Sequence, residues 1–424
     1  MRPSQRSQVP GFEVMSILAQ IDAMRSQGRD VVSLTAGEPG SGAPPAVNRA
    51  AAQIHAQDTV LNYSAALGVR PLRAAIAEHC RDWYDVDVAA ERVAVTTGSS
   101  GAFMLSFLAA FDVGDRVALA RPGYPAYRNI LSSLGIEVID LDCGPEVRFQ
   151  PTVELLDRAV AEGGPIAGLI LASPANPTGT MIAREELSAL VTWCRDREVQ
   201  LISDEIYHGI TYAEPDLDQE DADGAHRRAA SSDRPSPGVP SPGVSALELT
   251  DDAVVISSFS KYWGMPGWRL GWSVLPEHLV DPVARLAGNV SLCPPHGSQL
   301  AAVEAFTAES MDFAAAQVGQ YAAARQQVLE RLPELGWGEV APADGAFYVY
   351  AHIGRHGAEF GDAPSYCRAL LEHAGVAIVP GTDFDPVAGH EWVRLSLAPG
   401  PDVVAAGLDR IVEFHRARVA PSAS

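Results

Sequence analysis

Seven short apolar runs follow one another along the middle of this 424-residue chain, and helical stretches separate most of them. The runs are RVAVTTG (92–98), RVALARP (116–122), EVIDLD (137–142), AGLILASP (167–174), VQLISDEIY (199–207), AVVISSFS (253–260) and RLGWSVL (269–275). Strands that alternate with helices predict an α/β fold with a seven-stranded, mostly parallel sheet between helices. The last two runs are too close for a helical crossover, so we expect one strand there to run antiparallel.

A different pattern begins near residue 297. Two helical stretches, 297–306 and 312–332, precede the apolar runs GAFYVYAHI, VAIVPG and WVRLSLA, which predict strands of a smaller α+β domain. A helix is expected over 12–27, and we expect this N-terminal part to pack with the C-terminal one. The predicted domains are 1–48 with the small domain, 49–296 as the large domain and 297–424 as the small domain.

The segment 213–246 has a composition unlike its surroundings. It begins with acidic residues, continues with Ser, Pro and Gly, and repeats the letters SPGV. Such a segment can bury little apolar surface, which predicts a flexible surface insertion. We expect no catalytic role for it.

The net charge and the cysteine content limit which partners and which cellular compartment the sequence predicts. The chain has 31 Lys plus Arg and 53 Asp plus Glu, a net charge of −22, which argues against nucleic acid or an anionic membrane as a partner. Five widely spaced cysteines without a CxxC pair favour a reducing cytoplasm and argue against a metal site or disulfides. The N-terminus has no apolar signal core, and no run is long enough to span a membrane.

Polar residues follow two of the predicted strands. TTGSSGA leads from a strand into a helix, whose N-terminal amides and dipole can bind phosphate beside Ser99 and Ser100. The alternative is an ordinary strand–turn–helix connection in which a serine caps the helix and no ligand binds. Asn176 in SPANPTG follows another strand, where loops line the ligand crevice of open α/β sheets, and a plain Asn-Pro turn is the alternative.

Two acids end the strand predicted within 199–207. Strand alternation places Asp204 and Glu205 on opposite faces of the sheet, and Tyr207 follows them. A carboxylate buried at the end of a sheet is costly unless it meets a cation. A solvated strand terminus is the alternative.

One lysine, Lys261, lies among the aromatic and apolar residues of SSFSKYWGMPGWRLGW (257–272). A desolvated lysine has a lowered pKa, and its neutral amine can form a Schiff base with a carbonyl. A snorkelling or ion-paired lysine is the alternative. Ser258, Ser260 and Arg269 surround it and are types that bind phosphate. Together with a strand-end acid, these are the groups that pyridoxal 5′-phosphate requires.

In combination, these motifs resemble those of the fold type I pyridoxal-phosphate aminotransferases of class I/II. The resemblance runs from about residue 12 to 416 and is interrupted by the acidic insertion. Its motifs are AGEP, NYSAALGVRPLR, TTGSSGA, RPGYPAY, SPANPTG, SDEIYHG, SFSKYWGMPGWRLGW, DGAFYVY and VRLSLA, in the order of the family. The chain is similar above all to an actinobacterial type with members named valine–pyruvate or aspartate aminotransferases.

The resemblance implies roles for residues that act on the cofactor ring. Lys261 bonds the cofactor and then moves a proton between the substrate Cα and the cofactor. Asp204 pairs with the pyridinium nitrogen, Tyr207 and Asn176 hydrogen-bond the phenolic oxygen, and Tyr124 stacks on the ring.

The resemblance also implies how the phosphate and the substrate are held. Ser99, Ser100, Ser258 and Arg269 bind the phosphate. Tyr63 reaches the phosphate in the other subunit of a homodimer with shared active sites. The α-carboxylate of the substrate is bound by Arg394, with Asn176 and the backbone at Gly37. A surface-paired arginine is the alternative interpretation of Arg394 taken alone.

The expected function is that of an aminotransferase, which moves an amino group from an L-amino acid to a 2-oxo acid through pyridoxal and pyridoxamine phosphate. The chain has GEPGSG (37–42) where the family often has an acid and an aromatic, and no second arginine for a side-chain carboxylate is apparent. We expect the glycines of this loop to loosen or enlarge the substrate pocket. The missing arginine favours a neutral donor, with the valine/alanine–pyruvate type as the expected class. The alternatives are a C–S β-lyase or another pyridoxal-phosphate enzyme, such as a cyclopropane-carboxylate synthase, on the same scaffold.

Overall fold

The computed structural model describes residues 2–212 and 242–419. Most of the predicted insertion, residues 213–241, lies outside the described residues. Its C-terminal end is described and packed, because Ser245 and Ala246 are fully buried and Ser245 caps a short 3-10 helix, Ala246–Glu248. Composition assigned these residues to the insertion because they continue its run of small residues.

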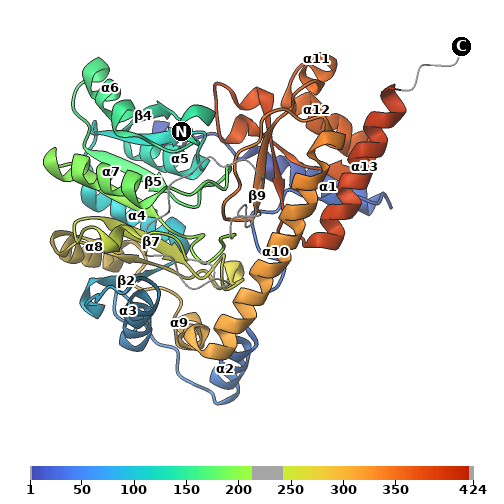
Figure 1. The fold of residues 1–424 in the computed structure, drawn as a ribbon. Helices are drawn as coiled ribbons and strands as arrows, with labels where there is room; N and C mark the ends of the chain where they lie inside the picture. Colours follow the sequence, from blue (N-terminus) through green and yellow to red (C-terminus); the bar gives the residue numbers. More distant parts are fainter. Residues whose placement is uncertain (1, 213–241, 420–424) are drawn as a thin grey trace, which may run out of the picture.

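The seven predicted strands form one sheet, in the order β2-β8-β7-β6-β5-β3-β4 (Figure 1). The strands are β2 (Val93–Thr96), β3 (Arg116–Arg121), β4 (Glu137–Asp142), β5 (Gly168–Ala172), β6 (Gln200–Asp204), β7 (Val254–Ser258) and β8 (Gly271–Val274). β8 is antiparallel to β2 and β7, and every other pair in this sheet is parallel. Both the mostly parallel sheet and its antiparallel strand are confirmed.

Helices cover both faces of this sheet. Successive strand residues point to opposite faces, and both sets are apolar and buried. In β6, Leu201 belongs to one apolar core and Ile202 to the other. One face packs against α3 (Arg70–Tyr84), α6 (Val153–Gly163) and α7 (Arg184–Asp196), and the other against α4 (Gly98–Ala110), α5 (Pro125–Leu134) and α8 (Glu277–Val290). A sheet buried on both faces explains why its strands are continuous apolar runs.

A smaller unit contains residues from both ends of the chain. β9 (Tyr348–His352), β11 (Val379–Pro380) and β12 (Trp392–Ser396) form an antiparallel sheet in the order β11-β12-β9. β1 (Val32–Ser33) pairs in parallel with β10 (Val376–Ala377). The run VAIVPG, predicted as a single strand, is therefore divided at Ile378 between two sheets.

The remaining helices are α1 (Glu13–Ser26), α2 (Pro45–Ala56), α9 (His296–Ala302), α10 (Ala308–Leu335), α11 (His356–Phe360), α12 (Ala363–Ala369) and α13 (Pro401–Val419). The long helix α10 packs against α13 in the smaller unit and against α2 at its other end (Figure 1). The predicted boundary after residue 48 falls inside α2, so we propose that the large domain begins at this helix.

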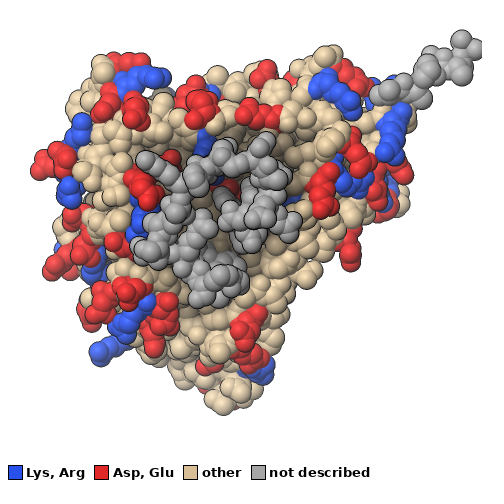
Figure 2. All heavy atoms as spheres, in the orientation of Figure 1, with Lys and Arg blue, Asp and Glu red and all other residues tan. Residues whose placement is uncertain are grey.

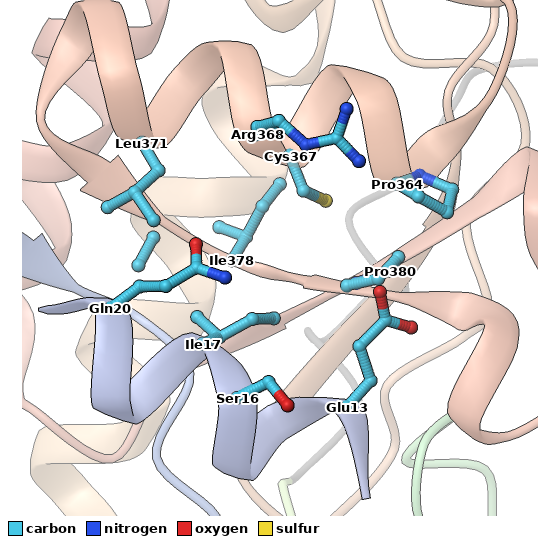
Figure 3. Close-up of a pocket in the computed structure, with 11 residues that line it drawn as sticks. Glu13, Ser16, Ile17, Gln20, Pro364, Cys367, Arg368, Leu371, Ile378 and Pro380 are labelled. Carbon is cyan, nitrogen blue, oxygen red and sulfur yellow. The ribbon is translucent and has the colours of Figure 1, made fainter.

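The N-terminal helix α1 packs against the smaller unit. Ile17 and Ile21 share an apolar cluster with Leu371 and Ala377. The Asp383 carboxylate accepts hydrogen bonds from the backbone N–H groups of residues 13 and 14, at 2.9 and 3.1 Å, and so caps α1 from the far end of the chain. A cavity of about 100 Å³ remains between α1 and residues 364–380 (Figure 3), and no predicted site residue lines it.

Several expectations about partners can be compared with the described residues. Their helices include none long and apolar enough to cross a membrane. All five cysteines lie in the described residues as free thiols. Acidic and basic side chains are interspersed on the face seen in Figure 2. Within the described ranges, no group of three or more His, Cys, Asp or Glu side chains could hold a metal ion.

Candidate active site

The predicted site residues follow the carboxyl ends of neighbouring strands. Tyr124, Asn176, Asp204 and Lys261 come at or just after the ends of β3, β5, β6 and β7. These strands are parallel, so their ends meet at one edge of the sheet, where ligands bind in open α/β folds. The smaller unit contributes Arg394 from β12 to the same place, since its guanidinium donates a hydrogen bond to Asn176.

The amine of Lys261 is partly buried at this edge. Its Nζ donates a hydrogen bond to the backbone carbonyl of Gly37 at 2.5 Å and lies 5.6 Å from the ring centroid of Tyr207. Burial, and then the positive charge of Arg394, lower the pKa of Lys261 to about 8. About a tenth of this amine is therefore neutral at pH 7, far more than for a lysine with the ordinary pKa.

Lys261 is also the only lysine among the 424 residues, and the other 30 of the 31 basic residues (31 − 1) are arginines. Arginine cannot lose its proton in a protein, so it cannot serve as a neutral amine. The single position at which this chain has a lysine in place of arginine is the one where the sequence analysis expects a neutral amine. This composition is a stronger signal than the apolar setting alone.

Asp204 is buried at the end of β6, with 4% of its surface exposed. Its carboxylate accepts hydrogen bonds from the Tyr127 hydroxyl and from the N–H of Ile206. Burial raises the pKa of Asp204 to about 6, and both hydrogen bonds oppose that rise. Glu205 turns to the opposite face, where it accepts from the Ser203 hydroxyl at 2.9 Å, as strand alternation predicts.

Tyr127 is a site residue that the sequence analysis missed. It lies in the motif RPGYPAY, three residues after Tyr124, and so belongs to the first turn of α5 and faces the sheet. The helical spacing of the two tyrosines could have indicated it. The ring of Tyr124 lies 5.4 Å from that of Tyr127, edge to face, and is stacked on Phe12 at 6.5 Å.

Arg394 is buried, with 4% of its surface exposed. It donates hydrogen bonds to the Asn176 side-chain oxygen at 2.9 Å and to the Thr35 carbonyl at 3.1 Å. Its Nε is buried without a hydrogen-bond partner among the described residues. The guanidinium is stacked between Tyr348 and Phe384, with Cζ at 4.4 and 4.7 Å from the two ring centroids.

Tyr207 contacts Tyr348, a residue that the sequence analysis did not assign to the site. Its hydroxyl is hydrogen-bonded to that of Tyr348 at 2.8 Å, and both side chains are buried. Burial raises the pKa of both tyrosines, so both phenols stay protonated at neutral pH. The motif DGAFYVY contains Tyr348, but the sequence could not indicate which residues it contacts.

The four predicted phosphate-binding residues come from segments that approach closely. α4 begins at Gly98 without a side-chain cap, and it carries Ser99, which is half-buried, and Ser100, which is exposed. A Cβ added to Gly98 would lie 2.7 Å from an Nη of Arg269. Ser258 ends the strand that pairs with β8, and its Oγ donates to the carbonyl of residue 270 at 3.2 Å.

Tyr63 is not brought to this cluster. It is 80% exposed and lies in the loop before α3.

A family model for class I and II aminotransferases matches residues 29–411. The chain belongs to this family. It is 45% identical over 406 residues to a valine–pyruvate aminotransferase of Mycobacterium tuberculosis, covering 95% of this chain and 96% of that protein. It is 30% identical to a (5-formylfuran-3-yl)methyl phosphate transaminase of Methanocaldococcus jannaschii, covering 95% and 96% of the two chains.

Solved structures of the family have the same fold. An aminotransferase from Mycobacterium tuberculosis matches with a TM-score of 0.86 and 43% identity, over 98% of this chain and 100% of that chain. Aspartate aminotransferase from Thermus thermophilus with maleate matches with a TM-score of 0.83 and 30% identity, over 98% and 100%. The protein is therefore a pyridoxal-phosphate-dependent aminotransferase, as the motifs predict.

The residues of the site fit this cofactor. An uncapped helix N-terminus beside Arg269 suits a phosphate. A buried carboxylate, Asp204, suits a cationic ring nitrogen, and Lys261 supplies the amine. Gly271 keeps the phosphate end compact, because a Cβ there would lie 2.6 Å from the backbone of Gly98 and Ser99.

The lowered pKa of Lys261 predicts how stability depends on pH. Between the folded pKa of about 8 and the ordinary 10.5, the unfolded chain binds a proton that the folded chain lacks, so stability rises with pH. Lys261→Met removes the cost of burying the ammonium group. At pH 7 the cofactor-free variant should therefore unfold at a higher temperature than the wild type, and the difference should shrink above pH 8. Equal melting temperatures at pH 7 would contradict a desolvated amine.

Filling the space at Gly271 should weaken phosphate binding. In Gly271→Ala, the new Cβ must displace the start of α4, so affinity for pyridoxal phosphate should fall by at least about tenfold. Affinity for pyridoxal, which lacks the phosphate, should change little. Gly267→Ala is the matched control, because no atom lies within 4 Å of a Cβ there. An equal loss for both ligands, or a lower melting temperature without cofactor, would place the damage outside the phosphate site.

Proposed function

We propose that this enzyme transfers the amino group of a neutral L-amino acid to a 2-oxo acid, with valine or alanine and pyruvate as the expected substrate class. The relative that is 45% identical is a valine–pyruvate aminotransferase, and this likeness supports the class. The main structural support for this proposal comes from the residues that surround Arg394.

The described chain has two buried arginines, Arg121 and Arg394, and they differ in their partners. Arg121 forms an ion pair with the buried carboxylate of Asp385 at 2.9 Å. Arg394 has no carboxylate partner among the described residues, and its Nε has no partner at all. An unpaired buried cation is costly, so its retention supports a carboxylate ligand as the missing partner.

The preference for a neutral side chain rests on what surrounds this anchor. Arg394 is enclosed by the aromatic rings of Tyr348 and Phe384. Tyr124 and Phe12 add a further stacked pair at the same edge of the sheet. Aromatic surfaces favour apolar groups over a second carboxylate.

We propose the following cofactor contacts. Lys261 bonds the cofactor, Asp204 holds the ring nitrogen, and Tyr207 and Asn176 hydrogen-bond the phenolic oxygen. The ring face packs on Tyr124. The phosphate is held by Ser99, Ser100, Ser258 and Arg269, and the substrate carboxylate by Arg394 with Asn176 and the backbone at Gly37.

The chain's own groups suit the proton transfer. When bound, the cofactor supplies a carbonyl and an electron-withdrawing ring. Lys261, with a pKa of about 8, can take a proton from the substrate Cα and return it near neutral pH. Asp204 keeps a positive charge on the ring nitrogen, and Arg394 fixes the orientation of the Cα–H bond.

The half-reaction with single amino acids tests the proposed function. We expect L-valine or L-alanine, without an oxo acid, to convert the cofactor absorbance of the wild type to that of pyridoxamine phosphate, and pyruvate to restore it. L-aspartate should react at least about tenfold more slowly, because we find no second arginine for a side-chain carboxylate beside Arg394 among the described residues. Release of ammonia without cofactor conversion would indicate a lyase, and faster reaction with aspartate would overturn the neutral class.

We also propose a homodimer that shares its active sites through Tyr63. The loop around this residue is apolar and exposed, with Val60 74% and Leu61 40% exposed. Residues at and just after the end of α8 are exposed as well, with Val290 at 60% and Leu292 at 53%. The two segments are joined by a 3.3 Å hydrogen bond from the backbone N–H of Ser64 to the Cys293 Sγ. Exposed apolar side chains on neighbouring segments support association.

Sedimentation tests the dimer. The wild type should sediment as a dimer, and Leu292→Glu should shift it to monomers because a charge would be buried in the interface. Val387→Glu is a control at a site with 61% exposure in the smaller unit and should leave the dimer intact. Tyr63→Phe should also leave the dimer intact while weakening pyridoxal phosphate binding. A monomeric wild type would contradict the shared site.

A further inference from the structure

Tyr348 on β9 contacts three parts of the site at once. Its side chain is fully buried. Its hydroxyl is 2.8 Å from that of Tyr207, and its ring lies against the guanidinium of Arg394 at 4.4 Å. A Cβ added to Gly37, the residue whose carbonyl accepts from Lys261, would lie 3.4 Å from the Tyr348 hydroxyl. Tyr348 therefore lies between the anchor for the substrate and the groups for the cofactor.

The hydroxyl of Tyr348 determines how Tyr207 can use its own proton. Two protonated phenols that share one hydrogen bond must divide the roles of donor and acceptor. If Tyr207 donates to a ligand, its oxygen is free to accept, and Tyr348 must be the donor between the two. Accepting this bond makes Tyr207 a stronger donor, because successive hydrogen bonds polarise one another.

The ring of Tyr348 has a separate effect. It forms one wall of the space that holds Arg394, and Phe384 forms the other. A buried guanidinium between two aromatic faces is restricted to one plane, and cation–π attraction stabilises it there. Holding this plane also fixes the direction of the Nε–H group, which has no hydrogen-bond partner among the described residues.

We propose that Tyr348 is a positioning residue with two separable functions: its hydroxyl sets the hydrogen-bond donor strength of Tyr207, and its ring orients Arg394 toward a carboxylate. This inference rests on the proposed function, since it assumes a cofactor beside Tyr207 and a carboxylate beside Arg394. It predicts that the two functions can be removed one at a time.

Two variants separate the functions. Tyr348→Phe removes the hydroxyl and keeps the ring, whereas Tyr348→Leu removes both. Tyr350→Phe is the matched control: Tyr350 lies on the same strand, is 1% exposed, and its hydroxyl has no hydrogen-bond partner within the described ranges. Melting of the cofactor-free proteins establishes that each variant folds.

Two quantities report on the two functions, and both can be measured without catalytic turnover. The first is the pH midpoint of the visible absorbance of the bound cofactor. If Tyr207 is a weaker donor, the phenolic oxygen of the cofactor keeps more negative charge. A proton held beside that oxygen is then released only at higher pH, so the midpoint rises. The second is the Kd of isovalerate, a carboxylate with the branched chain of valine and no amine.

In Tyr348→Phe we expect the midpoint to rise by about 0.5 pH unit or more, with the isovalerate Kd within about twofold of wild type. In Tyr348→Leu we expect the Kd to rise about tenfold as well. Tyr350→Phe should change neither quantity.

An unchanged midpoint in Tyr348→Phe would overturn the role of the hydroxyl, and an unchanged Kd in Tyr348→Leu would overturn that of the ring. A wild type that has no cofactor absorbance, or does not bind isovalerate, would contradict the proposed function as well. A wild type that passes both tests confines any failure of the variants to this inference.

Discussion

The buried amine of Lys261 is the interaction on which the rest of the site depends. An ammonium group there would lie in an apolar setting near Arg394, and both conditions lower its pKa, to about 8. Its hydrogen-bond acceptor, the carbonyl of Gly37, belongs to the segment that follows β1, and β1 pairs with a strand near the other end of the chain. The amine is thus desolvated only when the large sheet and the smaller unit are assembled around it.

Strand direction explains why so few elements are needed. The strands β5, β6 and β7 are parallel neighbours, so the residues that follow their carboxyl ends, Asn176, Asp204 and Lys261, lie at one edge of the sheet. The antiparallel strand β8 begins at that same edge, and the turn before it brings Arg269 back to the start of α4. A parallel β8 would place the start of its strand, and Arg269 with it, at the opposite edge.

Most of the fold could be predicted from the sequence, because the inner strands of the large sheet are buried on both faces and are therefore apolar runs, whereas only the edge strand β4 is largely exposed. The residues at strand ends could be predicted for the same reason. Tyr127 was missed although its spacing from Tyr124 could have indicated it. Tyr348 could not be predicted, because it acts through Tyr207, a partner that is distant in sequence. The division of VAIVPG at Ile378 was missed because apolar patterning is the same whether a run joins one sheet or two. The assigned roles of the site residues remain predictions.

The most direct test of this account is the pKa of Lys261 in the protein without cofactor. Because the chain has a single lysine, reductive methylation with carbon-13 formaldehyde labels one side-chain amine, and its NMR shift can be followed with pH apart from that of the α-amino group. We predict a midpoint near 8, as burial beside Arg394 requires. A midpoint near the ordinary 10.5 would mean that the amine is solvated, and would contradict the central claim.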